Sequence, residues 1–291
     1  MNTMSTTTFR PAAALLRLEL AEALRSRWLQ FTAVVYALVF SGFVWLGLRE
    51  SRVLGFTGLS RVVLNVANAV VLAVPLVALV ATTQTIVRAR QSGFFELMLA
   101  QPVRRRDWFV SAVLSRFVVV VGPLAAMLLA ALVAGQLGLT GAGGARDPDL
   151  APMVARSLVV TVSLGWAFLG IGFWLSAIAK TPERATVLAL VAWILAAALH
   201  DFALVGALLK LRLAPGVVFG LAAVNPVEAA RIAILGGVDP ELSVLGPVGF
   251  WLANAMGNAR ALAVGILWPL FLGTAAMVAA ERRLRRADLV G

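Results

Sequence analysis

Few residues in this chain of 291 are of the types that carry out covalent chemistry. Cysteine is absent, which excludes disulfides, thiolate nucleophiles and cysteine-based metal sites. His200 is the only histidine, which excludes a His-Glu-x-x-His zinc motif and a multi-histidine haem site. No Gly-x-Ser-x-Gly elbow occurs, and neither Lys180 nor Lys210 follows the glycine spacing of a phosphate-binding loop. The sequence therefore predicts that the chain is not an enzyme and does not bind ATP through such a loop.

The pair His200-Asp201 lies near the end of a long apolar run. A carboxylate at such a place is costly unless it is paired or faces water. We expect Asp201 to make a polar contact with Arg231 or Arg260, and a ligand for a transported ion is the alternative. A single histidine with scattered methionines is weak support for a copper site, although thioethers suit Cu(I). We therefore expect the chain to bind no metal and no other cofactor.

Composition places the chain among the integral membrane proteins, with 61% hydrophobic residues, 13% charged residues and a mean hydropathy of +0.93. A bilayer core about 30 Å thick requires about 20 apolar residues of helix. Six largely apolar runs reach this length: 28–48, 62–87, 108–139, 157–179, 185–209 and 261–280. Pro75, Pro123 and Pro269 lie inside three of them, where membrane helices tolerate proline. We expect an all-α integral membrane protein with one domain, residues 1–291, and six transmembrane helices.

The distribution of basic residues predicts the orientation of these helices. If both termini are cytoplasmic, 16 of the 25 lysines and arginines fall in cytoplasmic segments, as the positive-inside rule requires. A net charge of +11 is also typical of proteins that bind nucleic acid. Here the basic residues border the membrane helices, so we interpret them as a topology signal and as contacts with anionic membrane lipid. We expect no nucleic acid partner.

Residues 1–27 are predicted to form an amphipathic helix at the cytoplasmic interface. Leucines recur at near-helical spacing between residues 15 and 24, charged residues take the other angles, and Pro11 suits a first helical turn. Such a helix would lie along the membrane surface. A solvated basic extension is the alternative.

Residues 210–259 are predicted to form short periplasmic helices before the last span. Asn225 and Pro226 have the types of an N-cap and a first-turn proline, and Glu228 is the acid of the third position. A second start signal follows at 239–241 and a third piece at 248–256. We expect these helices to cap the outer mouth as a gate or as a contact for a periplasmic accessory protein; helices that only complete the fold are the alternative. The candidate residues are His200, Asp201, Asn225, Pro226, Glu228 and Arg231.

A charged segment, residues 88–107, separates the second and third apolar runs. Phe94, Leu97 and Met98, with Phe95 as a further member, are predicted to form one apolar face of a short helix that Pro102 ends. Lying parallel to the membrane, this helix would fit a groove of a cytoplasmic partner. An ordinary basic loop is the alternative. The candidate residues are Arg90, Ser92, Gly93, Phe94, Glu96, Leu97, Met98, Gln101, Pro102 and Arg104.

The pattern Ser-Gly-x-x-Glu-Leu-x-Leu-x-x-Pro, between the second and third of six membrane helices, resembles the coupling helix of ABC-2 type permeases. Its residues are Ser92, Gly93, Glu96, Leu97, Leu99 and Pro102. A short inner turn at 176–186 and a long insertion before the last helix extend the resemblance over nearly the whole chain. The resemblance implies a homodimer in the bacterial inner membrane. It also implies a separate cytoplasmic ABC ATPase subunit that binds ATP and Mg²⁺ and docks on the coupling helix.

Two further stretches, LAQPVRRR and AVNPVEAARIAILGGVDPELSVLGPVG, are similar to permeases of the nitrous-oxide-reductase maturation transporter and of related multicopper-enzyme-maturation transporters. Such permeases often carry Tyr-Asp where this chain has His200-Asp201. The resemblance implies a role in copper-centre assembly during denitrification, through transport or a conformational change at the periplasmic side. An ATPase-independent secondary transporter or channel is the alternative, and it predicts polar residues at mid-membrane and paired broken helices.

Overall fold

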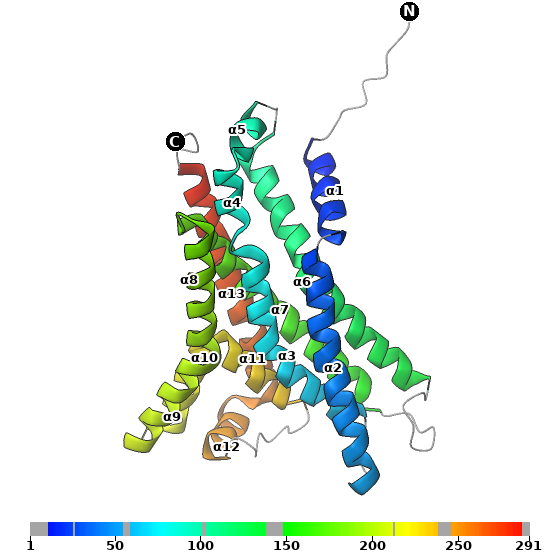
Figure 1. Ribbon diagram of the computed structural model, residues 1–291. Coiled ribbons are helices and arrows are strands. Elements are labelled where there is room, and N and C mark those ends of the chain that lie inside the picture. The colour runs from blue at the N-terminus through cyan, green and yellow to red at the C-terminus, as the bar shows by residue number, and fades with distance from the viewer. Residues whose placement is uncertain are drawn as a thin grey trace, which may run out of the picture.

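The computed structural model describes residues 11–25, 27–54, 59–100, 103–137, 148–211, 213–237 and 246–286. This part of the chain is helical throughout and contains no strand, as the sequence predicts (Figure 1). The helices are α1 Pro11–Leu24, α2 Arg27–Leu54, α3 Leu59–Thr82, α4 Thr85–Gln91, α5 Phe94–Leu99, α6 Arg105–Gln136, α7 Leu150–Ile178, α8 Pro182–Ile194, the π-helical η1 Leu195–Leu199, α9 His200–Lys210, α10 Pro215–Val224, α11 Pro226–Leu235, α12 Gly246–Ala255 and α13 Gly257–Arg286.

Five helical segments in the described residues are long and apolar enough to cross a membrane. They are residues 65–91 of α3 and α4, then α6, α7, the continuous α8–η1–α9, and α13. The bent pair α10–α11 would add a sixth if it counted as one span. The first expected span corresponds to α2, whose described apolar part, Leu29–Gly42, is shorter than the others. The chain is therefore a multi-pass helical membrane protein, with five or six helices that can span in the part that the structure describes.

The helix α7 packs against α3 and α13 at the centre of the bundle, and most of its residues are buried. Close approach depends on glycine. A Cβ atom on Gly273 of α13 would overlap the backbone of Trp166 and Ala167 in α7, and one on Gly172 of α7 would overlap the Thr82 hydroxyl of α3. Small residues at such crossings allow backbones to approach, which drives helix association where lipid removes the hydrophobic effect.

The two ends of the bundle differ in what they carry. Figure 1 shows α5, the start of α1 and the last turns of α13 at one end, called here the α5 end. The opposite end, with α9 and α12, is called the α12 end. The start of α1 and the end of α13 thus lie on the same side, as a chain with both termini in one compartment requires. Which compartment each end faces stays a prediction.

The helix α1 forms where the sequence predicts one, but its placement differs. It lies beside α6 and runs along the bundle instead of across its end (Figure 1). Ala23 is buried and Leu15 packs against the core, whereas Leu18 is exposed. Burial is the main influence on Glu19 and raises its pKa, while attraction by Arg116 and a hydrogen bond with the Trp108 side chain act in the opposite direction. These contacts with α6 hold α1 upright.

Candidate functional site

Two groups of predicted residues, at opposite ends of the bundle, form the candidate site. The first is the α4–α5 segment, which follows a break in the helix after Thr82. Before the break, two threonine hydroxyls donate hydrogen bonds to backbone carbonyls of α3: Thr82 to that of Ala78 at 2.7 Å and Thr83 to that of Leu79 at 2.8 Å. After the break, the Ser176 hydroxyl of α7 accepts hydrogen bonds from the backbone N–H groups of residues 86 and 87, at 2.9 and 3.2 Å. The start of α4 is therefore capped by another helix.

A glycine turn separates α4 from α5. Gly93 has φ of +70°, a left-handed conformation that a side chain would strain, and it is the N-cap of α5. The helix α5 has six residues and ends at Leu99, with Ala100 as its C-cap. The sequence places the end of this helix at Pro102, which lies outside the described residues together with Gln101. The short helix itself is confirmed.

The predicted apolar face of α5 is wrong in its composition. Phe95 is 1% exposed and Met98 is also buried, both within the core of the bundle. The ring of Phe95 meets that of Trp108 edge-on, with centroids 4.9 Å apart. Leu97, in contrast, is 70% exposed, and Phe94 is partly exposed. This six-residue helix therefore has two apolar sides. One side attaches it to α6, and the other faces outward.

The segment is also joined to the turn between α7 and α8, the 176–186 turn of the sequence analysis. Gln84 donates to the Thr186 hydroxyl at 2.7 Å. Arg90 donates to the carbonyl of Ala177 at 3.4 Å, and Gln91 to that of Lys180 at 3.4 Å. The turn ends at Thr181, whose hydroxyl accepts from the N–H of residue 184 and caps α8. The remaining polar candidates, Ser92, Glu96 and Arg104, are exposed at this end.

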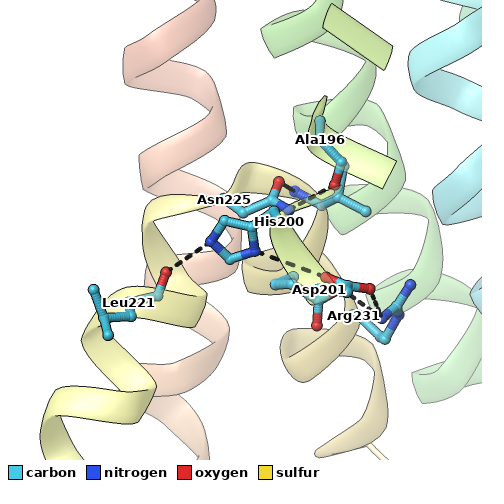
Figure 2. Close-up of polar contacts among 8 residues, drawn as sticks. Ala196, His200, Asp201, Leu221, Asn225 and Arg231 are labelled. Atoms are coloured by element: carbon cyan, nitrogen blue, oxygen red, sulfur yellow. Dashed lines mark hydrogen bonds and ion pairs between the residues drawn. The ribbon is translucent and has the colours of Figure 1, made fainter. Parts of the chain in front are cut away.

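The second group lies between α8–α9 and the hairpin α10–α11, towards the α12 end. The chain direction bends by 117° between the two helices of the hairpin, at Asn225 and Pro226. As predicted, the Asn225 side chain caps α11, accepting from the N–H of Val227 at 3.0 Å, and Pro226 is its first residue. We call His200, Asp201, Asn225, Glu228 and Arg231 the polar cluster; Figure 2 shows all of these but Glu228 labelled.

Ion pairs and hydrogen bonds of the polar cluster join the two elements. Arg231 Nη1 of α11 lies 3.3 Å from Asp201 Oδ2 of α9 (Figure 2). It also lies 2.5 Å from Glu228 Oε1 of its own helix. His200 Nε2 donates to the carbonyl of Leu221 at 3.1 Å. The expected partner of Asp201 is thus Arg231, and Arg260 is exposed. The contact of Asp201 with Arg231 is the polar contact that the sequence favours over an ion ligand.

A π-helical turn lies where α8 meets the polar cluster. In η1 the carbonyl of Ala196 accepts a hydrogen bond from the Asn225 side-chain amide at 2.7 Å (Figure 2). The same amide group therefore caps α11 with its oxygen and holds η1 with its nitrogen. π-Turns often occur at functional sites, because they release a carbonyl for an external donor.

The expectation that α11 lies at the outer surface is wrong. Seven of its ten residues are buried, and it packs against α3, α7 and α13. Arg156 of α7 donates to the carbonyl of Ala233 at 2.5 Å and to Asn258 of α13 at 2.6 Å. The surface at this end consists instead of α10 and α12, where Val217, Val224 and Phe250 are exposed. The expected start signal at 239–241 lies outside the described residues.

The chemistry available to the polar cluster is structural. Among the described residues, no group of three or more His, Asp or Glu side chains is placed to hold a metal ion. His200 and Asp201 face one another at 3.7 Å without a hydrogen bond between them. The cluster therefore acts as a clamp between α8–α9 and the hairpin. Sequence reasoning missed Ser176, Trp108 and Arg156, because each acts through a partner more than 10 residues away along the chain.

Comparison with known proteins identifies the family. Residues 13–248 match the family described as ABC-2 family transporter protein. The chain is 28% identical to a probable ABC transporter permease protein NosY of Stutzerimonas stutzeri, over 87% of this chain and 89% of that protein. It is 29% identical to a protein of the same description from Pseudomonas aeruginosa, over 86% of this chain and 95% of that protein. The chain belongs to the ABC-2 transporter family and is a membrane-spanning permease subunit.

Proposed function

We propose that this permease is driven by a separate cytoplasmic ATPase that docks on α5. The supporting observation is the arrangement of α5 at the end of the bundle. Phe95 and Met98 fix the helix to the core, while Leu97 points outward beside the exposed Glu96. An exposed apolar side chain with adjacent charges on a short helix suits a partner whose groove receives a helix face. ATP and Mg²⁺ would be bound by the ATPase, and this chain would bind no cofactor.

The link from α5 into the bundle supports the same proposal. The α4–α5 segment is continuous with α3 and hydrogen-bonded to the α7–α8 turn through Ser176 and Ala177. A force on α5 therefore acts on the helices that lead to the polar cluster. The orientation follows: the α5 end faces the cytoplasm and the α12 end faces the periplasm, in the bacterial inner membrane.

A second copy of the chain is part of the proposed complex. In the most apolar stretch of α8–η1–α9 only 6% of residues are buried, against 67% for α7. Phe202 is 74% exposed on this span. An apolar helix with so few intrachain contacts can face either lipid or the same helix of another subunit. We propose that it faces the other subunit, because the family resemblance implies a homodimer.

The biological process is proposed from the relatives. Two proteins described as probable NosY permeases resemble the chain over most of its length. We assign the chain to maturation of the copper centres of nitrous-oxide reductase, with α10, α12 and the polar cluster as the gate or contact for a periplasmic accessory protein. One observation favours the ATPase-independent alternative: α10–α11 is a broken helix pair beside partly buried charges, a feature of secondary transporters.

The test compares two leucines of nearly equal exposure at the same end, Leu97 at 70% and Leu18 at 69%. Each is replaced by alanine in the full chain, which is co-expressed with its candidate ATPase subunit and purified in mild detergent. We expect L97A to weaken retention of the ATPase at least tenfold, since hot-spot truncations cost about 2 kcal/mol or more. L18A should leave retention unchanged.

Two results would refute the docking proposal: equal retention by L97A and the wild type, or full activity of the purified chain in liposomes without any ATPase. The second result would also establish the secondary-transporter alternative.

A further inference from the structure

A basic groove at the α5 end is not explained by the proposed function. It has a volume of about 600 Å³ and lies between α4, the last turn of α7 and the last two turns of α13. Figure 1 shows α4 and the end of α13 at this end. Four arginines line it: Arg90, Arg282, Arg283 and Arg286. Trp174, Ile178 and two alanines form its apolar part.

The arginines of the groove converge from two helices onto one carbonyl. Arg90 Nη2 donates to the carbonyl oxygen of Ala177 at 3.4 Å, and Arg283 Nε donates to the same oxygen at 3.2 Å. Arg282 and Arg286 are four residues apart and Arg283 lies between them, so α13 presents all three on neighbouring turns. A single neutral carbonyl is a weak partner for two guanidinium groups.

The groove lacks compensating negative charge. In the described part of the chain, no carboxylate lies within ion-pair distance of these four arginines. Glu281, the nearest acid along α13, pairs with Arg285 at 2.6 Å and with Arg106 at 3.8 Å. Arg90 Nε is buried and has no hydrogen-bond partner. A buried donor without an acceptor is costly, and the groove would be more stable with an anion in it.

The apolar part of the groove tells which kind of anion fits. Trp174 belongs to the membrane-spanning α7, lies one turn before Ile178 and is 41% exposed. Tryptophan is enriched at the level of the headgroups. A ligand that satisfied both parts would carry a phosphate at one end and a hydrocarbon chain at the other.

We propose that the groove binds an anionic phospholipid, with the headgroup phosphate among Arg90, Arg282, Arg283 and Arg286 and an acyl chain against Trp174 and Ile178. Inorganic phosphate would satisfy the arginines alone, and an acidic segment of a protein partner would need no apolar wall. The presence of both surfaces in one groove favours the lipid.

The experiment uses Trp174 as a reporter. Phosphatidylglycerol or phosphatidylcholine with brominated acyl chains is titrated into the purified full chain in detergent, and tryptophan fluorescence is measured. The contribution of Trp174 is the difference between wild type and W174F. We expect Trp174 to be quenched at a lower concentration of phosphatidylglycerol than of phosphatidylcholine.

The variants separate the groove from general electrostatics. R282Q/R286Q removes two exposed groove arginines and should raise the half-quenching concentration of phosphatidylglycerol about 30-fold, because each arginine near an anionic lipid contributes about fivefold. R106Q/R285Q removes the same charge from the residues paired with Glu281 and should change it less than twofold.

Three outcomes would overturn the proposal. Equal quenching by the two lipids, or equal shifts in the two double variants, would leave no specific lipid site. Recovery of fluorescence on addition of inorganic phosphate would assign the groove to free phosphate. If the co-expressed ATPase protected Trp174 from quenching by lipid, and R282Q/R286Q lost both this protection and the bound ATPase, the groove would be assigned to a protein contact.

Discussion

We predict that removal of different charges from the polar cluster lowers the free energy of unfolding by unequal amounts. Arg231 serves two carboxylates, at 2.5 Å from Glu228 and 3.3 Å from Asp201. The Glu228 side chain is 13% exposed and that of Asp201 is 34% exposed. Replacement of Arg231 leaves two carboxylates close together, one of them buried. Replacement of Asp201 by asparagine leaves the better buried pair intact.

Magnitudes follow from this difference in burial. Removal of one partner from a buried ion pair costs about 3–5 kcal/mol, whereas an exposed pair contributes about 0–1 kcal/mol. We expect R231M to lower the free energy of unfolding by about 3 kcal/mol, the lower value because Arg231 is itself 28% exposed. D201N should cost about 1 kcal/mol or less. The double variant R231M/E228Q should recover about 2 kcal/mol of the R231M loss, because neither partner is then left charged and unpaired.

Reversible unfolding in mixed detergent micelles, followed by circular dichroism, measures these changes. The control is R260M, which removes an exposed arginine near the start of α13 and should fall within about 0.5 kcal/mol of the wild type. A cost for D201N equal to that of R231M would show that the loss in R231M arises through Asp201 and not through Glu228. Absence of recovery in R231M/E228Q would show the same, and either result refutes the assignment of the larger contribution to the Glu228–Arg231 pair.

Two further predictions concern the dimer and α1. Because the chain has no cysteine, a single cysteine introduced at an exposed position of α8–η1–α9 can form a disulfide only with another copy, and we expect the positions that cross-link to recur at helical spacing near Leu195. Cysteines at Leu129 and Val133, which are exposed on α6, should not cross-link. Cross-linking of α6 alone would contradict the proposed interface. Burial raises the pKa of Glu19 above 4.5, so the stability this carboxyl contributes is present below its unfolded pKa and is lost as the pH rises through the folded value. E19Q should therefore stabilise α1 against proteolysis at neutral pH and remove that pH dependence. E22Q should keep the pH dependence and move it to lower pH, because the charge of Glu22 also raises the pKa of Glu19. An E19Q chain that titrates like the wild type would refute this account.

Helix starts could be predicted from the sequence because their causes are local. Asn225 precedes proline, and its side chain caps the following helix as expected. Thr181 also precedes proline and caps α8 in the same way. The short helix after Ser92-Gly93 forms for the same reason, since only glycine adopts φ of +70° at that turn without strain. A partner for Asp201 could be predicted because a carboxylate in an apolar run needs one, and Arg231 is one of the two candidates.

Burial of short helices could not be predicted in this way, because it depends on partners distant in the sequence. In α5, periodicity over six residues cannot tell which of Phe95 and Leu97 faces the bundle; the position of Trp108 decides it. In α11, the short length between its start and stop signals indicated a helix at the outer mouth. It is buried because Gly265 of α13 approaches Ala229 and Ala233 so closely that a side chain at Gly265 would not fit.

The hydrogen bonds of α7 bear on how the proposed ATPase would act at the other end of the bundle. Near the α5 end, Ser176 caps α4, and towards the α12 end Arg156 holds the carbonyl of Ala233 in α11. Movement of α4 or α11 against α7 would break these buried bonds, so α3, α4, α7, α11 and α13 are expected to move as one body. The span α8–η1–α9 is held to that body by Trp193, Gln84 and the polar cluster. Among the five candidate spans of the described residues it has the smallest buried share, and the polar cluster is where its displacement must be resisted or released.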